Sequence, residues 1–224
     1  MPPTISFCLP VFNGQAVIAQ TINSLLKQKE KGEILVFNDG STDNTRRILE
    51  FFKDDITIID SKERVGHAKG RNTLAQAAKG DIIAICDADI YEAERSTAIV
   101  EFFEQEKKDV FHSALNCCKA EDPSVVWQQE AYNWDFKSKC PISYPTVAYR
   151  RELALSCPHR EETMETCLYE FVLLDMHKEG AEFGGCQNPL MLKYEGDSHR
   201  NKKDAWKIKQ RIYKEYGIEI EISQ

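Results

Sequence analysis

The chain lacks a hydrophobic segment long enough to cross a membrane. No run of apolar residues approaches the ~20 that a membrane-spanning helix requires, and no basic stretch precedes an apolar one at the N-terminus. Prolines at positions 2, 3 and 10 interrupt that terminus, so it does not look like a secretory signal. We therefore expect a protein with no transmembrane segment that works in the cytoplasm.

Paired cysteines of the kind found in zinc and redox motifs are also missing. The chain has eight cysteines, but none are spaced as Cys-x-x-Cys, and Cys117 and Cys118 are adjacent, a poor arrangement for metal ligands. Cys8 and Cys86 lie inside apolar runs, where a reduced cysteine behaves as a small hydrophobic residue. We expect free thiols in a reducing compartment.

Positive charge is in short supply. The 224 residues include 29 Lys and Arg against 36 Asp and Glu, a formal net charge of −7, so the surface as a whole does not attract a nucleic acid backbone. No nucleic acid partner is expected. The basic segment at residues 200–214 is predicted to be a solvated amphipathic helix, with peripheral contact to a membrane surface as the alternative.

Short apolar runs alternate with helical patterns through the first half of the chain. This alternation predicts an α/β fold with a Rossmann-like, mostly parallel central sheet and helices on both faces. The predicted strands are 5–9, 34–37, 56–59 and 81–86, and the predicted helices are 16–26, 45–52, 68–78 and 93–103. No repeat, low-complexity tract or linker interrupts the sequence, so residues 1–224 are expected to form one domain.

The pattern loosens after Phe103. We predict strands at 110–115 and 146–149, an irregular aromatic stretch at 127–139, and helices at 163–178 and 206–216. The first of these helices should end at Gly180, because glycine is the usual residue just past a helix C-terminus.

Asp87-Ala88-Asp89 directly follows the apolar run that ends at Cys86. Two like charges so close repel one another, and a buried strand that delivers them into the interior makes both costly to ionise. Mg²⁺ or Mn²⁺ removes both costs, because hard cations bind carboxylate oxygens together with the phosphate oxygens of a substrate. Asp87 and Asp89 are therefore candidate metal ligands.

Two further polar motifs follow predicted strands. In Asn38-Asp39-Gly40-Ser41, Gly40 permits a tight turn, and Ser41, Thr42 or Asp43 can cap the next helix. Capping does not explain Asp39, whose carboxylate can accept a hydrogen bond from a nucleobase. Arg71, near the start of the next predicted helix, can stack on a base or reach a phosphate. The plain alternatives are a simple strand-to-helix turn and an exposed helical arginine.

Together these motifs resemble the family 2 glycosyltransferases, which have the GT-A fold. Pro10-Val11-Phe12-Asn13 matches that family's strand ending in Pro-x-(Tyr/Phe)-Asn. The strand-two motif, a helix with Arg71-Asn72, a Gly80-Asp81 turn and the Asp-x-Asp strand end follow in the family's order, over about residues 4–105. The joint match is far more specific than any one motif.

The resemblance implies a nucleotide-sugar donor, most often a UDP-sugar, that lies across the strand ends with Mn²⁺ or Mg²⁺ as cofactor. Asp39 would hold the base, Asp87 the ribose or a metal-bound water, and Asp89 the metal that bridges the diphosphate. The metal would stabilise the departing nucleoside diphosphate while the acceptor hydroxyl attacks from the opposite face, inverting the anomeric carbon. The donor-binding residues implied in this way are Pro10, Phe12, Asn13, Asp39, Arg71 and Asp87.

Two positions depart from the family pattern. Asn38 stands where the family usually has a first acidic residue, which removes one charge near the base. The catalytic base is expected at the start of the helix that ends at Gly180, where Leu168 and Tyr169 occupy the expected acidic pair. The candidates are Glu165, which we favour, and Glu170; each also suits an ordinary exposed helical position, as do the two glutamates 161 and 162 in the preceding loop.

The resemblance divides the chain into a nucleotide-sugar-binding half, 1–105, and an acceptor-binding half with a C-terminal helix, 106–224. His199 is a candidate third metal or phosphate contact, with a surface histidine as the alternative. Trp127, Tyr132 and Trp134 suit either sugar binding or core packing. The acceptor is open among glycans, lipid-linked sugars and small molecules, and a homodimer is possible.

Two other functions compete with this interpretation. A nucleotidyltransferase usually carries a glycine-rich basic loop after its first strand, and residues 11–16 have neither feature. A non-catalytic domain that binds a nucleotide or a partner protein is the second alternative, kept open by the uncertain position of the base.

Overall fold

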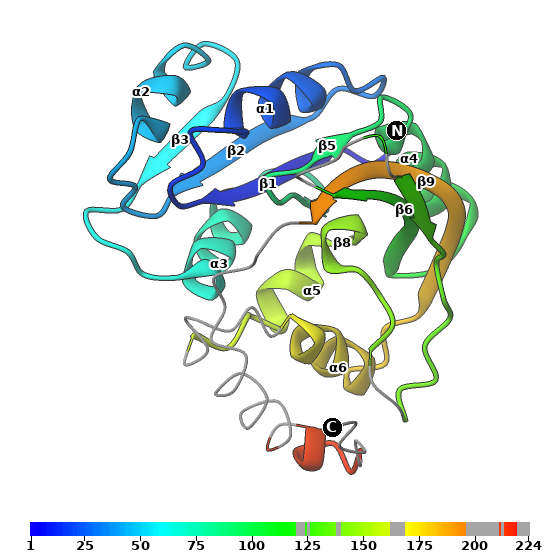
Figure 1. The fold of residues 1–224 in the computed structure, drawn as a ribbon. Coiled ribbons are helices and arrows are strands. Elements are labelled where there is room, and N and C mark those ends of the chain that lie inside the picture. The colour runs from blue at the N-terminus through cyan, green and yellow to red at the C-terminus, as the bar shows by residue number, and fades with distance from the viewer. Residues whose placement is uncertain are drawn as a thin grey trace.

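A mixed β-sheet runs through the centre of the protein (Figure 1). The computed structural model describes residues 1–119, 124, 126–137, 140–161, 169–195, 211 and 213–218. Within these residues, eight strands follow the order β3-β2-β1-β4-β8-β6-β9-β5, and β7 pairs with β6 beside that path.

The first half of the chain forms a parallel sheet, as the alternation predicted. Its strands are β1 (Ile5–Val11), β2 (Glu33–Asn38), β3 (Thr57–Asp60) and β4 (Ile82–Ile85), all paired in parallel. The helices that connect them are α1 (Ile18–Leu26), α2 (Thr45–Glu50) and α3 (His67–Ala77). Because parallel strands end at the same edge, the polar motifs that follow β1, β2 and β4 meet there.

The second half extends the sheet with mixed pairing. β4 pairs antiparallel with β8, β8 antiparallel with β6, β6 parallel with β9, and β9 antiparallel with β5. The remaining elements, of which the first two still precede residue 106, are β5 (Ile90–Tyr91), α4 (Arg95–Gln105), β6 (Val110–Lys119), β7 (Val126–Gln129), the 3₁₀ helix η1 (Tyr144–Thr146), β8 (Ala148–Arg150), α5 (Arg151–Ser156), α6 (Glu170–Lys178) and β9 (Phe183–Glu195).

Some elements differ from the predictions. β7 lies at the start of the stretch 127–139, which was predicted to be irregular, and β5, α5 and β9 were not predicted. Gly180 has a φ of +90° just past α6, so the predicted helix end is confirmed. α6 itself begins at Glu170. The predicted helix start at 163–168, and most of the predicted helix 206–216, lie outside the described residues.

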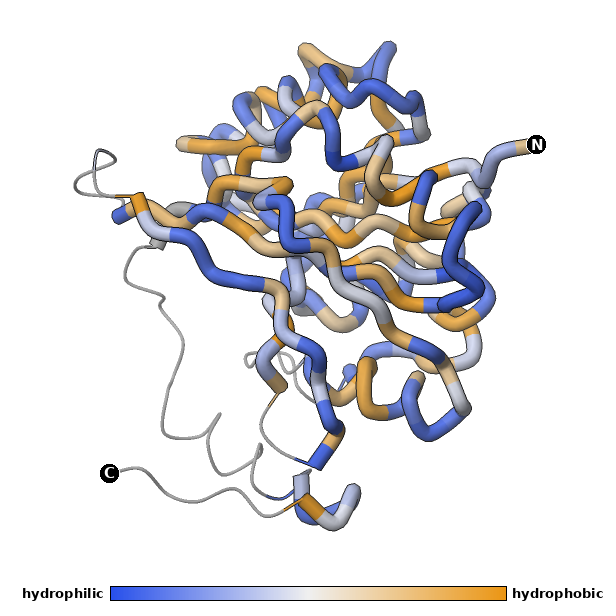
Figure 2. The backbone as a smooth tube through the Cα atoms, turned by 90° about the vertical axis from the view of Figure 1, so that its right-hand side faces the viewer, coloured by the Kyte–Doolittle hydropathy of each residue, from blue (hydrophilic) through white to orange (hydrophobic). Residues whose placement is uncertain are grey.

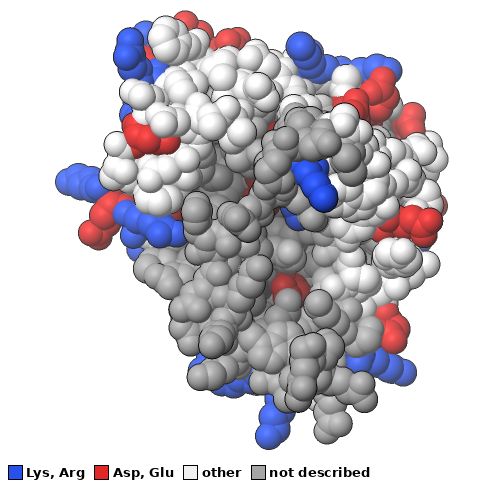
Figure 3. All heavy atoms as spheres, viewed as in Figure 1, with Lys and Arg blue, Asp and Glu red and all other residues white. Residues whose placement is uncertain are grey.

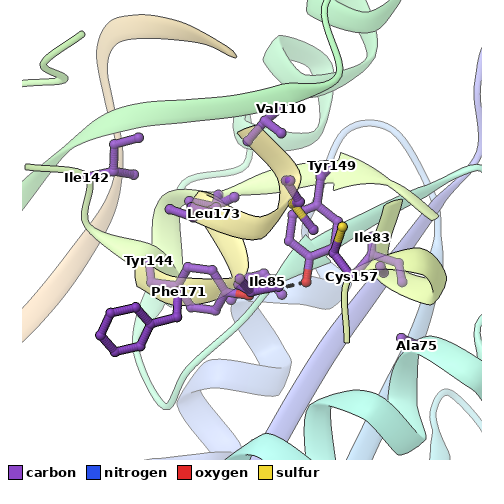
Figure 4. Close-up of a cluster of buried hydrophobic side chains, with 14 of the residues drawn as sticks. Ala75, Ile83, Ile85, Val110, Ile142, Tyr144, Tyr149, Cys157, Phe171 and Leu173 are labelled. Atoms are coloured by element: carbon purple, nitrogen blue, oxygen red, sulfur yellow. Dashed lines mark hydrogen bonds between the residues drawn. The ribbon is translucent and has the colours of Figure 1, made fainter. Parts of the chain in front are cut away.

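Buried side chains form two layers, one on each face of the sheet. Alternate residues of β1 and β2 enter opposite layers: Phe7 and Val36 join the helices α1, α2 and α4, whereas Cys8 and Leu35 join α3, α5 and α6. Figure 4 shows part of the second layer, in which Phe171 and Leu173 from α6 lie close to Tyr144 and Ile85. The hydropathy colouring of Figure 2 shows the apolar strands running through the middle, with hydrophilic turns around them.

Two properties of the described part concern membranes and cysteines. None of its helices combines the length and the apolarity that crossing a membrane would need. Seven cysteines fall in this part, and all of them are free thiols.

Candidate functional site

Three polar segments meet at the carboxyl edge of the parallel strands. The main-chain N–H of Asp39, just after β2, donates to the Val11 carbonyl of β1 at 2.8 Å, and the N–H of Cys86, just after β4, donates to the Cys8 carbonyl at 3.0 Å. These bonds keep β1 paired with β2 and with β4 up to the last residues of the strands. They place the loops that begin at Asn13, Asp39 and Asp87 beside one another, as the sequence predicted.

The loop after β1 is fastened to the loop after β2. Asn13 has a left-handed φ of +51°; its N–H donates to the Ser41 hydroxyl at 3.0 Å, and its Oδ1 accepts the Thr42 N–H at 2.8 Å. The Gly14 N–H donates to Thr45 Oγ1 at 2.8 Å. A short polar side chain with the tolerance of asparagine for φ > 0 suits this junction.

The other two residues of the Pro-x-Phe-Asn motif take different positions. Pro10 is buried within β1. Phe12 is partly exposed, and the Arg64 guanidinium carbon lies 4.4 Å from its ring centroid. This cation–π pair joins the residue after β1 to the loop between β3 and α3.

Asp39 holds the segment that leads into α3. Its carboxylate is 3% exposed; Oδ1 accepts the Val65 N–H at 2.6 Å and Oδ2 accepts the Gly66 N–H at 3.0 Å. Gly66 is the residue before α3, so this carboxylate fixes where the helix begins. Each oxygen retains a second lone pair, so these bonds are compatible with further acceptance from a ligand. The neighbouring Asn38 donates from Nδ2 to Asp60 at 2.8 Å.

Arg71 and Asp87 form an ion pair at the centre of the edge. Arg71, on α3, is only 7% exposed, and its Nη2 donates to Asp87 Oδ1, whose side chain is 33% exposed. The guanidinium carbon also lies 5.1 Å from the centroid of the Tyr144 ring. Arg71 was predicted to lie against a base or a phosphate. In the structure its guanidinium already contacts a carboxylate, Asp87, and an aromatic ring, Tyr144.

Tyr144 supports this ion pair from below and is fully buried. Its hydroxyl lies 3.2 Å from the Tyr149 hydroxyl, the contact drawn in Figure 4, and 2.6 Å from His159 Nε2. Burial raises the pKa of Tyr144 well above its usual value, so the phenol stays protonated. Burial, and next the Arg71 guanidinium, lower the pKa of His159 to about 3, so the imidazole is neutral.

Asp87 and Asp89 stand on a tight turn. The Asp89 N–H donates to the Asp87 carbonyl at 2.8 Å, and the Asp87 N–H donates to the Tyr91 hydroxyl at 2.7 Å. Asp89 is 8% exposed. No group of three or more His, Cys, Asp and Glu side chains capable of holding a metal occurs among the residues the structure describes. Two carboxylates are the usual protein share at a Mg²⁺ or Mn²⁺ that also binds the phosphates of a substrate.

Glu170 is the first residue of the helix that ends near Gly180, and it is 3% exposed. The preceding residue, Tyr169, stacks on Tyr144, with ring centroids 4.8 Å apart and 5° between the planes. The Tyr144 ring therefore contacts both Tyr169, at the start of α6, and the guanidinium of Arg71. Glu165 and His199, the other predicted site residues, lie outside the described residues.

The three aromatic residues of the second half separate into two groups. Trp134 is 7% exposed and belongs to the core layer shared with α6. Trp127 and Tyr132 are 38% and 51% exposed. The core interpretation therefore holds for Trp134, whereas Trp127 and Tyr132 are exposed and lie outside the core.

Tyr144 and His159 carry no sequence signal, whereas Asn72 belongs to the same motif as Arg71. The side chain of Asn72, next to Arg71, makes two hydrogen bonds with the main chain of His159. Asn72 Nδ2 donates to the His159 carbonyl at 2.9 Å, and the His159 N–H donates to Asn72 Oδ1 at 2.8 Å. Tyr144 and His159 belong to a stretch without regular periodicity. On the face shown in Figure 3, described charges of both signs are interspersed around the rim.

The sequence of this chain matches a known protein family. The family described as Glycosyl transferase family 2 matches residues 6–163. The Escherichia coli protein UDP-Glc:alpha-D-GlcNAc-diphosphoundecaprenol beta-1,3-glucosyltransferase WfgD is 38% identical over 87 residues, which are 38% of this chain and 34% of that protein. The chain therefore spans about a third of the length of this relative.

Solved structures share the fold. TarS 1–349 from Staphylococcus aureus, in complex with UDP-GlcNAc, superposes with a TM-score of 0.76 at 18% identity, over 97% of this chain and 68% of that one. Glucosyl-3-phosphoglycerate synthase from Mycobacterium tuberculosis, in complex with Mn²⁺, UDP and glucosyl-3-phosphoglycerate, has a TM-score of 0.66 at 15% identity, over 97% of this chain and 81% of that one. At these identities the likeness concerns the GT-A fold.

Proposed function

The chain belongs to glycosyl transferase family 2, and from that membership we propose that it transfers a sugar from a nucleotide-diphosphate sugar to an acceptor hydroxyl, with inversion and with a divalent metal. The observation that carries the proposal is the set of Arg71, Asp87 and Asp89 at the meeting point of β1, β2 and β4. UDP is the favoured nucleotide, because WfgD is named for UDP-Glc and both structural neighbours were solved with UDP or a UDP-sugar.

The donor would lie across the strand ends from β2 towards β4. Asp39 and the Phe12–Arg64 pair stand at the β2 end, where acceptor groups and an aromatic face suit a base. Asp87 and Asp89 stand at the β4 end, where carboxylates suit a metal–diphosphate unit. Asn38, in place of the usual carboxylate, leaves the base end less negative.

The donor set fits a divalent cation shared with the substrate. Asp87 and Asp89 would hold it with one or two oxygens, the usual protein share for Mg²⁺ or Mn²⁺ at a diphosphate. When bound, the cation supplies Lewis-acid stabilisation of the departing nucleoside diphosphate. Mn²⁺ in the complex of glucosyl-3-phosphoglycerate synthase supports this part of the proposal. Arg71 holds Asp87 in place and adds a positive charge beside the leaving group.

Among the described residues, Glu170 is our candidate for the general base. It is the first residue of α6, and the residue before it, Tyr169, stacks on Tyr144, whose ring contacts Arg71. In this role its carboxylate would accept the proton of the acceptor hydroxyl as that oxygen attacks the anomeric carbon from the face opposite the diphosphate. Glu165, favoured from the sequence, remains a second candidate. The acceptor would lie over residues 106–224.

Release of UDP from a panel of UDP-sugars, with and without Mn²⁺, tests the proposal. The panel is run on the wild type, on Asp89→Asn, and on the charge-matched control Asp54→Asn, whose carboxylate is exposed beyond α2. We expect metal-dependent turnover of one donor that Asp89→Asn loses and Asp54→Asn keeps. Binding of a nucleotide without turnover of any donor, even when candidate acceptors are added, would instead favour the non-catalytic domain.

A further inference from the structure

Arg95 is a fully buried arginine that has no role in the donor site described above. It is the first residue of α4 and is 0% exposed. Its Nη2 donates to the Ile85 carbonyl at 2.8 Å, the Pro145 carbonyl at 3.2 Å and the Val147 carbonyl at 3.5 Å. Nη1 lies 3.7 Å from Cys86 Sγ.

This cation is costly where it lies. No carboxylate of the described residues lies within ion-pair distance of the guanidinium, and its Nε has no hydrogen-bond partner there. Burial of an unpaired cation costs several kcal/mol, and an apolar side chain is often the more stable choice at such a position. A positive charge in the first turn of a helix is also opposed by the helix dipole. The bonds of Arg95 to main-chain carbonyls offset part of this cost, so the segments that carry those carbonyls indicate what the arginine holds together.

The contacts of Arg95 surround the Asp87–Asp89 turn. Ile85 and Cys86 are the residues that lead into that turn from β4. On the other side of the turn, the Tyr91 ring centroid lies 4.6 Å from the guanidinium carbon. The Tyr91 hydroxyl accepts the Asp87 N–H at 2.7 Å and donates to the Asp87 carbonyl at 3.3 Å.

The same guanidinium also reaches the wall opposite the turn. The carbonyls of Pro145 and Val147 flank Thr146, at the end of η1. That helix begins with Tyr144, which lies beneath Arg71, the partner of Asp87. A single buried group therefore joins the entry to the turn, the exit from it, and the support of its ion pair.

We propose that Arg95 is a positioning residue that, with Tyr91, holds the Asp87–Asp89 turn in the geometry that presents both carboxylates to a cation and a diphosphate. This inference rests on the proposed function. It assigns the buried charge a task that an apolar residue of similar volume does not perform, because only a planar group with several donors reaches three carbonyls and stacks on a ring. Arg95 touches neither substrate nor cation.

The test measures how tightly Mn²⁺ binds in the presence of UDP, by electron paramagnetic resonance of the ion. Three variants are compared with the wild type: Arg95→Lys keeps the charge but loses the planar fork, and Tyr91→Phe removes one hydroxyl from a ring that still fits. Leu49→Ala, in the fully buried position of α2, is the control for lost stability. Urea denaturation of every variant gives its loss of stability.

We expect Arg95→Lys to weaken Mn²⁺ binding ~10-fold or more, the usual effect of removing a group that orients a metal ligand. Tyr91→Phe should weaken it less and broaden the signal of the bound ion. Leu49→Ala should leave the affinity within about twofold of the wild type, although it loses stability.

The possible results test the positioning role and the proposed function separately. Wild-type affinity and an unchanged spectrum in both Arg95→Lys and Tyr91→Phe would overturn the positioning role while leaving the proposed function intact. If Arg95→Lys does not fold, Tyr91→Phe decides alone, because it deletes a single oxygen. Absence of Mn²⁺ and UDP binding in the folded wild type would overturn the proposed function, and this inference with it.

Discussion

Gly40 offers a sharp test of how the loops of the site are packed. It follows Asp39, has a φ of +64°, and lies against the segment that Asp39 holds. A Cβ at this position would lie 2.6 Å from the carbonyl carbon of Glu63 and 2.8 Å from the nitrogen of Arg64. Both are main-chain atoms, so no change of rotamer relieves the clash. Gly40→Ala must therefore push the 63–64 main chain away.

The size of the effect follows from two contributions. A non-glycine residue in the left-handed region costs about 1–2 kcal/mol, and forcing an extra methyl group into packed surroundings costs about 1–3 kcal/mol. The expected loss for Gly40→Ala is their sum, about 2–5 kcal/mol. Gly180→Ala is the matched control, because its φ is +90° but nothing lies within 4 Å of the added Cβ. It carries only the backbone contribution.

Urea denaturation of the two variants and the wild type separates these contributions. The difference between Gly40→Ala and Gly180→Ala should be about 1–3 kcal/mol, since the backbone strain and the change in unfolded-chain entropy occur in both. Displacement of residues 63–64 should also strain the bonds from Val65 and Gly66 to Asp39, so UDP should bind more weakly to Gly40→Ala alone. Equal losses of stability in the two variants would refute the packing described for this loop.

Three further predictions concern the buried polar groups. Asp87→Asn removes the charged partner of the nearly buried Arg71 and should cost about 1–3 kcal/mol of stability in urea denaturation. This range is reduced because the Asp87 side chain is a third exposed, so water screens the interaction. A loss equal to that of Asp54→Asn would contradict a stabilising ion pair between Arg71 and Asp87. Asn72→Ala removes both bonds to the main chain of His159 and should cost about 1–3 kcal/mol, with faster proteolysis near residue 159; unchanged proteolysis and stability would count against it. Burial lowers the pKa of His112 to about 4, below the ~6.5 of the unfolded chain, so its contribution is present above pH 6.5 and is lost towards pH 4. That loss should reach about 3 kcal/mol, and His112→Gln should flatten stability measured between pH 7 and pH 4.5; an unaltered slope would show that other groups dominate.

The first half of the fold was predictable because its local patterns agree with its tertiary structure. Apolar runs of strand length alternate with helical periodicity up to Phe103, and parallel pairing follows from that order. The second half does not have this property. β9 contains Gly184, Gly185 and Pro189, which suppress a strand pattern, and its pairing with β6 includes register shifts at Ser113 and Ala114.

The same distinction applies to the site. Asp39, Arg71, Asp87 and Asp89 could be named from the sequence because each belongs to a recognisable motif after a strand or near the start of a helix; their roles stay predictions. Tyr144 and Arg95 could not be named in this way, because a single buried polar residue has no periodicity and its partners are distant in sequence. The base was assigned to Glu165, which lies outside the described residues, so that assignment stays a prediction; Glu170 is the first residue of α6.

Calorimetric titration of UDP into the protein, with Mn²⁺ present and then after removal of metal by EDTA, tests the central claim most directly. Saturable binding that disappears without the metal in the wild type, and that Asp89→Asn does not show even with Mn²⁺, is the predicted result. Binding of UDP that is equally strong without metal, or that survives Asp89→Asn unchanged, would contradict a donor site built on the Asp87–Asp89 turn.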